Sequence, residues 1–76
     1  LSSADITKYS VNDKLHGELG KVNRLIEMQH YPLIEILVGE KEILIPAAEE
    51  IILKIDRKNK IIYINAPEGL IDMYLQ

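Results

Sequence analysis

The sequence predicts an all-β fold, a small antiparallel six-stranded β-barrel with a short C-terminal helix or helical turn. Short apolar runs rich in β-branched residues recur along the second half of the chain, at 43–45, 51–55 and 61–64. Turn-forming residues separate these runs, a pattern that is typical of strands joined by hairpins. Because the chain has four Tyr and no Phe or Trp, its core must be built from Ile, Leu and Val, which favour sheet.

Length and composition restrict the class of protein. A chain of 76 residues allows one small domain, and its 47% hydrophobic content must stabilise the fold without cysteine. The absence of Cys fits a reducing compartment, so we expect a cytoplasmic protein. A net charge of −3 argues against direct binding of nucleic acid. No apolar run approaches the roughly 18 to 20 residues that a membrane helix needs, which predicts a soluble protein.

The N-terminal part is expected to contain a linker, a strand and a glycine-rich loop. Residues 1–4 are small and polar enough to be a linker remnant, which leaves 5–76 as the domain. Alternation over 5–11 predicts a first strand, and the paired glycines of 17–20 predict a loop. A strand is then expected over 21–28. A helix over 13–27 is the weaker alternative, because each glycine inside it would cost about 1 kcal/mol.

A β-hairpin is predicted over 33–45. Pro32 closes the connection before it, since proline cannot donate a hydrogen bond to a strand partner. Two strand-like runs are separated by Gly39 and Glu40, and a two-residue loop with glycine first indicates a type II′ turn. Glu40 and its neighbours at the tip should face solvent.

The second half is expected to add two more strands and the C-terminal helix. Pro46 ends the preceding strand, and residues 47–50 suffice for one helical turn. In the strand over 51–55, alternation places Leu53 on the buried face. The following turn is assigned a left-handed residue at Asn59. The proposed core residues are Ile45, Leu53, Ile55, Ile62 and Ile64.

The C-terminal segment after Gly69 has apolar residues at 70, 71, 74 and 75. This spacing predicts a short helix over an open end of the barrel, with a frayed tail as the alternative.

Residue patterns give no catalytic, cofactor or metal site. His16 and His30 have no spaced third ligand, and adjacent carboxylates on a turn usually diverge into water. The basic cluster at 57–60 is interpreted as a solvated hairpin tip, with a phosphate contact as the alternative. Tyr31 precedes a proline in a loop, and Tyr is a favoured anchor at protein interfaces, so it is the best interface candidate. Tyr63 is assigned equally to the core or barrel rim and to an interface.

The run KEILIPAAEEIILKIDRKNKIIYINAPEGLID, from Lys41, closely resembles the end of the C-terminal PRC-barrel domain of the RimM family of bacterial ribosome maturation factors. In that family a strand ending in Ile-Pro, an acidic turn, a strand closing in Asp and a final Pro-Glu-Gly-Leu recur. Residues 17–22 are similar to the entry of the domain's second strand, so the resemblance covers about 5–72. Two family features differ. The places of an aromatic pair before Asp5 hold Leu1, Ser2 and Ser3, and a common glycine is replaced by Lys8.

The resemblance implies a six-stranded barrel that acts without catalysis or cofactor, as a monomer. It implies binding to a ribosomal protein of the small-subunit head, of the S-nineteen family, in late assembly and rRNA processing. A stand-alone PRC-barrel adaptor in a structural or membrane-associated complex is the alternative. The net negative charge of the chain would complement a basic ribosomal protein. The expected protein-binding residues are Tyr31, Glu40, Glu42, Glu49 and Glu50.

Overall fold

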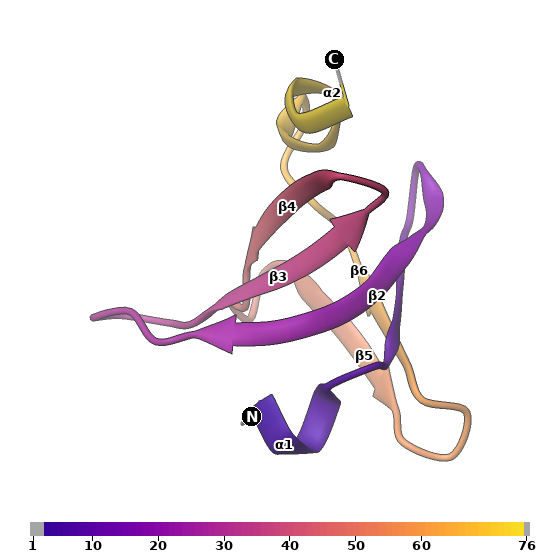
Figure 1. Ribbon diagram of the computed structural model, residues 1–76, viewed down its shortest axis with the longest axis vertical. Coiled ribbons are helices and arrows are strands. Elements are labelled where there is room, and N and C mark those ends of the chain that lie inside the picture. Colours follow the sequence, from indigo (N-terminus) through magenta and orange to yellow (C-terminus); the bar gives the residue numbers. More distant parts are fainter. Residues whose placement is uncertain (1–2, 76) are drawn as a thin grey trace.

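The structure, a computed structural model, describes residues 3–75, which form six strands and two short helices. The strands make one strongly curved sheet that wraps around the core; α1 lies against β2 and α2 lies against β4 (Figure 1). Within residues 3–75, neither helix is long and apolar enough to cross a membrane. The elements are α1 (Ser3–Ile6), β1 (Ser10–Asp13), β2 (Gly17–Ile26), β3 (Leu33–Val38), β4 (Lys41–Pro46), β5 (Ile52–Asp56), β6 (Ile61–Ile64) and α2 (Leu70–Leu75).

The sheet has the strand order β4-β3-β2-β1-β6-β5, which confirms the six-stranded, barrel-like all-β fold. Neighbouring strands are antiparallel except β1 and β6, which run parallel. The expectation that all pairs are antiparallel is therefore wrong for this pair, because β6 reaches β1 by a long route through the chain and not by a hairpin. In the part of the chain that the structure describes, β4 and β5 are the two ends of the sheet, which stays open between them.

The first strand starts later than the sequence predicts. Residues 1–2 of the expected linker lie outside the described residues, and Asp5 and Ile6 belong to α1 and not to a strand. The helical turn places Ile6 in the core with no exposed surface, and its carbonyl accepts a 3.0 Å hydrogen bond from the backbone N–H of Tyr9. Burial of the Ile6 side chain thus outweighs the weak alternation of this segment, and the strand forms only from Ser10 onward.

Lys8 has a φ of 71°, a left-handed conformation, and it stands at the place where the family that the sequence resembles commonly has glycine. A side chain with Cβ is strained there, by about 1 kcal/mol. Lys8→Gly should therefore raise the free energy of unfolding by up to about 1 kcal/mol, since removing Cβ relieves more strain than the added unfolded-state entropy costs. Urea denaturation checks this. Lys21→Gly in β2 is the control and should destabilise; a loss of stability in Lys8→Gly as well would contradict the strain.

The glycine pair was assigned to a loop, and this is wrong, because Gly17 and Gly20 both lie within β2. At Gly20 the backbone of β3 approaches closely. A Cβ there would lie 2.9 Å from the carbonyl oxygen of Leu37, so no side chain fits without movement of β3. The helix considered over 13–27 is excluded by the strand.

The hairpin of β3 and β4 is confirmed, with Val38 paired to Lys41. Gly39 has a φ of 63°, and only the first turn residue is left-handed, as a type II′ turn requires. After Pro46, residues 47–50 form the expected turn, closed by a 3.0 Å hydrogen bond from the backbone N–H of Ile51 to the carbonyl of Ala48.

β5 contains a β-bulge that reverses one core assignment. Ile52 pairs with Ile64 and Lys54 pairs with Tyr63, so Leu53 is an extra residue without a partner on β6. The bulge turns the Leu53 side chain outward, and 56% of it is exposed. The prediction that Leu53 is buried is therefore wrong.

The other four proposed core residues are buried or packed against the core. Ile45, Ile62 and Ile64 have no exposed surface, and Ile55 is half-buried against them. At the C-terminus, α2 packs against β4 and buries Ile71, which confirms the predicted helix for this segment.

The turn between β5 and β6 also differs from its prediction. Lys60, with a φ of 57°, is the left-handed residue. Asn59 was assigned that role, but its backbone N–H donates a 3.0 Å hydrogen bond to Asp56 Oδ1, which holds it in the preceding part of the turn.

Candidate protein-binding grooves

A network of hydrogen bonds joins the β1–β2 turn to the segment after β6. Asp13, at the end of β1, is 5% exposed and accepts hydrogen bonds from three backbone N–H groups: Leu15 at 3.1 Å, His16 at 3.0 Å and Ala66 at 2.9 Å. Burial alone would raise the pKa of this carboxyl. The hydrogen bonds from Ala66 and His16 outweigh burial and lower its pKa below the usual value. Asp13 is therefore a charged structural acceptor.

His16 lies between two carboxylates. Its Nδ1 is 2.9 Å from Asp13 Oδ2 and its Nε2 is 2.8 Å from Asp72 Oδ1 in α2. The hydrogen bonds to Asp13 and then to Asp72 raise the pKa of the imidazole. Only a protonated ring donates from both nitrogens, so the imidazolium form connects α2 to the β1–β2 turn.

This arrangement predicts that stability depends on pH near neutrality. The pKa of His16 is raised in the folded state. The protonated ring therefore contributes fully to the free energy of unfolding below the unfolded pKa of about 6.5, and this contribution is lost as pH rises through the folded pKa. The free energy of unfolding should therefore fall as the pH rises from about 6.5 through the folded-state pKa. His16→Gln should flatten this slope, because glutamine does not titrate. Urea denaturation at several pH values tests both; an equal slope in the variant would contradict the assignment.

Two shallow grooves share the lining residue Glu50. The first, called the Tyr31 groove, has a volume of about 450 Å³. Tyr31 and Pro32 come from the β2–β3 loop, and Ala47 to Glu50 come from the turn after β4. Tyr31 is 43% exposed, so much of its ring remains available to a partner. The structure thus brings together three of the five predicted binding residues: Tyr31, Glu49 and Glu50.

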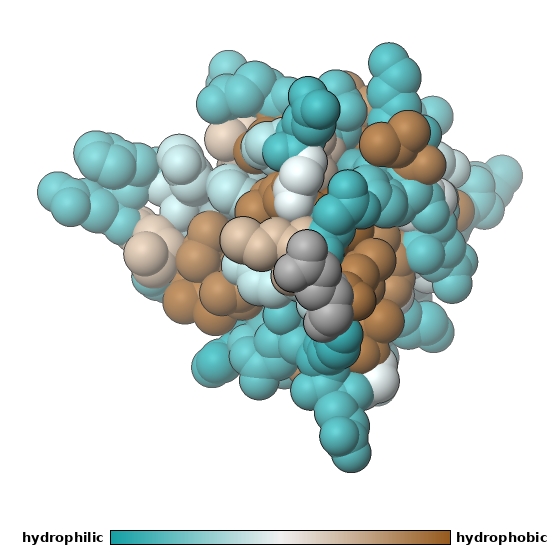
Figure 2. Space-filling model, turned by 90° about the horizontal axis from the view of Figure 1, so that it is seen from above, coloured by the Kyte–Doolittle hydropathy of each residue, from teal (hydrophilic) through white to brown (hydrophobic). Residues whose placement is uncertain are grey.

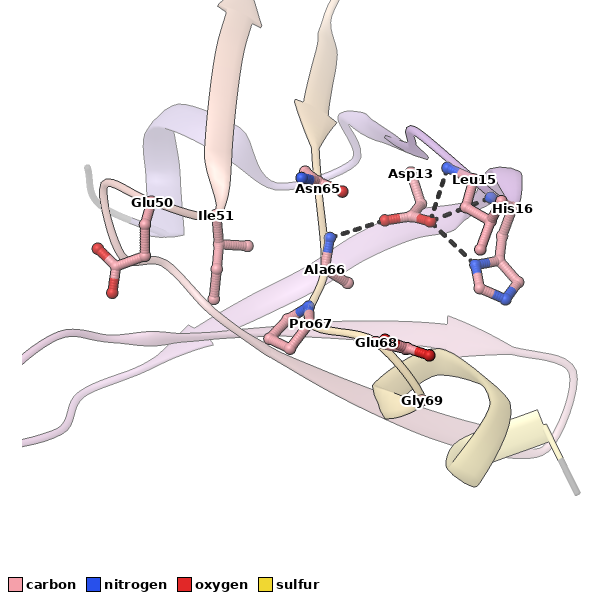
Figure 3. Close-up of a pocket in the computed structure, with 10 residues that line it drawn as sticks. All are labelled: Asp13, Leu15, His16, Glu50, Ile51, Asn65, Ala66, Pro67, Glu68 and Gly69. Carbon is pink, nitrogen blue, oxygen red and sulfur yellow. Dashed lines mark hydrogen bonds and ion pairs between the residues drawn. The ribbon is translucent and has the colours of Figure 1, made fainter.

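The second groove, called the Pro67 groove, has a volume of about 560 Å³. Figure 3 shows Ile51, Ala66 and Pro67 in its middle, with Glu50 on one side and Glu68 and His16 on the other. Leu15 also lines this groove. Sequence patterns assigned no binding role to Leu15 or Glu68, because the groove joins turns that are far apart in the chain.

Glu40 and Glu42 lie away from both grooves. They belong to the β3–β4 hairpin tip and the start of β4, whereas Glu49 and Glu50 follow the other end of β4. β4 has six residues and a length of roughly 20 Å, and Glu42 is its second residue, so most of the strand lies between the two pairs. The hypothesis that the four carboxylates group in space is therefore wrong, because β4 keeps the two pairs apart.

The remaining candidate residues have local partners or lie in solvent. Tyr63 is half-buried, and the Nζ of Lys54 lies 5.9 Å from its ring centroid, which is a cation–π contact. His30 is exposed beside the Tyr31 groove. Among residues 3–75 no group of three or more His, Asp or Glu side chains is placed to hold a metal ion.

One buried carboxylate was missed by sequence reasoning. Glu35 on β3 is 3% exposed and accepts hydrogen bonds from Asn23 Nδ2 at 2.7 Å and Arg24 Nε at 3.2 Å. Asn23 and then Arg24 lower the pKa of Glu35 by bonding its charged form. Both donors come from β2, where a bulge at Asn23 places neighbouring side chains on the same partner. Glu35 is accordingly a structural group.

Comparison with known proteins gives consistent matches. The family described as the RimM PRC barrel domain matches residues 3–70. The ribosome maturation factor RimM of Flavobacterium psychrophilum is 41% identical over 71 residues, which cover 93% of this chain and 41% of that protein. The protein of the same name from Bacteroides fragilis is 42% identical over 65 residues, covering 86% of this chain and 36% of that protein. The chain thus spans about two fifths of the length of these relatives.

A solved structure has the same fold. It is a RimM protein of Pseudomonas aeruginosa, described as a 16S ribosomal RNA processing protein, and it superposes with a TM-score of 0.77 at 17% sequence identity. The match covers 88% of this chain and 44% of that chain. At this identity the likeness establishes the fold of the domain.

Proposed function

The chain belongs to the RimM PRC barrel domain family, and from this premise we propose that it is a non-catalytic ribosome maturation module. In this proposal residues 5–76, as a monomeric domain in the cytoplasm, bind a basic ribosomal protein of the small-subunit head, of the S-nineteen family. This binding assists late small-subunit assembly and rRNA processing. The relatives named as ribosome maturation factors support this role over that of an adaptor in a membrane-associated complex.

The observation that carries the proposal is the composition of the Tyr31 groove. An exposed aromatic ring and the small apolar surface of Pro32 and Ala48 lie beside the carboxylates of Glu49 and Glu50. An apolar anchor next to like charges is suited to a basic protein surface, because the ring supplies desolvated contact area and the carboxylates attract the partner. Glu40 and Glu42 would add long-range attraction from the other end of β4.

Binding kinetics separate these two contributions. Tyr31→Ala should increase the dissociation rate about tenfold, as expected for loss of a buried anchor. Replacing Glu49 and Glu50 with Gln should slow association several-fold at low salt and flatten its salt dependence, because rim charges act mainly on encounter. The same change at Glu40 and Glu42 should have a smaller effect. Surface plasmon resonance with the purified ribosomal protein at two salt concentrations measures all three.

The control for the aromatic anchor is Met28→Ala. Met28 is 54% exposed in the same loop but lines neither groove, so its replacement should leave dissociation unchanged. If the folded wild-type domain does not bind the ribosomal protein, the proposed partner is wrong. If Met28→Ala and Tyr31→Ala have equal effects, the Tyr31 groove is not the contact.

A further inference from the structure

The two grooves meet at one residue. Glu50 lines both the Tyr31 groove and the Pro67 groove, and it directly precedes Ile51 at the start of the link into β5. In Figure 3 the Glu50 side chain lies on the far side of Ile51 from Asp13 and His16. The grooves therefore adjoin at this carboxylate, and the two together are called the track below.

Each half of the track offers apolar surface. The Tyr31 groove offers Tyr31 and Pro32, and the Pro67 groove offers Leu15 and Pro67. Leu15 is 82% exposed, although its backbone N–H is fixed by Asp13 at 3.1 Å. A large apolar side chain held out on a fixed backbone makes a preorganised contact, since little conformational freedom is lost when a partner covers it. On the space-filling view, hydrophobic residues likewise reach the surface in separate patches among hydrophilic ones (Figure 2).

The acidic side chains along the track outnumber the basic ones. Glu49, Glu50 and Glu68 line it, and none of the described lining residues is Lys or Arg. Two histidines line it, His16 and His30, and the ring of His16 already donates to Asp13 and Asp72. Lys14 flanks the lining residues in sequence without being one of them. The track therefore complements a positively charged segment that also carries apolar side chains.

We propose that this track binds one extended segment of a basic protein, with a Lys or Arg side chain at Glu50 and apolar side chains on either side of it, one in each groove. The proposal rests on the function proposed above and extends its contact surface from the Tyr31 groove to Leu15 and Pro67. An extended chain suits a narrow two-part track, because its alternate side chains point to the same side.

The test is a titration of the ¹⁵N-labelled domain with the purified ribosomal protein of the kinetic experiment, followed by NMR. Amide signals of both grooves, including those of Leu15, Glu50 and Gly69, should shift together with one dissociation constant, while those of α1 stay in place. Shifts confined to one groove, or two separate constants, would overturn the single track while leaving the proposed function intact. A complete absence of binding would overturn both.

The binding affinities of matched variants give a second test of the two-groove contact. Leu15→Ser should weaken binding about fivefold, because a central apolar contact is lost. Leu53→Ser is its control, since Leu53 is also exposed but lies on β5 outside both grooves, and it should change affinity less than twofold. Glu50→Gln should weaken binding more than Asp5→Asn, which removes one charge from α1. If each variant and its control weaken binding equally while the folded domain still binds, the two-groove contact is refuted and the proposed function is not.

Discussion

Asp13→Ala should lower the free energy of unfolding by about 3 kcal/mol, a large part of the stability of a domain this small. The substitution removes an acceptor from three backbone N–H groups and from the His16 ring. Ala66 is 53 residues away in sequence, so this one carboxylate fixes the path of the chain after β6 relative to the β1–β2 turn. Urea denaturation at pH 7 measures the loss.

Asp56→Ala is the matched control for Asp13. Asp56 also bonds a backbone N–H three residues later, that of Asn59, but it does so on an exposed hairpin with local partners only. Asp56→Ala should lower the free energy of unfolding much less, because water can replace the acceptor there. Similar losses in the two variants would show that Asp13 is only a turn residue.

Ile64→Ala should lower the free energy of unfolding by about 2 to 5 kcal/mol and leave little folded protein. Ile64 has no exposed surface and pairs with Asp13 of β1 and Ile52 of β5, so its truncation leaves a cavity where three strands meet. Thermal melting followed by circular dichroism tests this.

Leu53→Ala is the counterpart of that experiment on β5. The side chain is outside the core, so the change should stay within about 0.5 kcal/mol of wild type. A large loss at Leu53 would mean that the bulge is absent and that the strict alternation read from the sequence holds.

The sequence predicted correctly those elements that depend on residues close together in the chain. The β3–β4 hairpin follows from a glycine that takes a left-handed conformation, and the strands of the second half follow from their β-branched runs. The start of the chain was mispredicted, because burial of Ile6 depends on the whole core. Leu53 was misplaced because a bulge is one extra residue, and a strict period of two cannot show it.

The candidate site was only partly predictable for the same reason. Tyr31, Glu49 and Glu50 were identified from residue type and loop position, and the structure places them in one groove. Glu68 lies in the Pro-Glu-Gly-Leu motif, but the sequence predicted a binding role neither for it nor for Leu15, because the two line one groove only when the β1–β2 turn meets the segment after β6. The separation of Glu40 and Glu42 from the groove is likewise set by the course of β4.

The most direct test of the central claim is affinity purification of the tagged full-length protein together with assembling small ribosomal subunits. Wild-type protein should recover small subunits that contain unprocessed rRNA. The double variant Glu49→Arg and Glu50→Arg, checked to be folded by circular dichroism, should recover few of them, because reversed charge repels a basic partner. Equal recovery by the two proteins would contradict the claim that this acidic groove carries the domain's contact with the ribosomal protein.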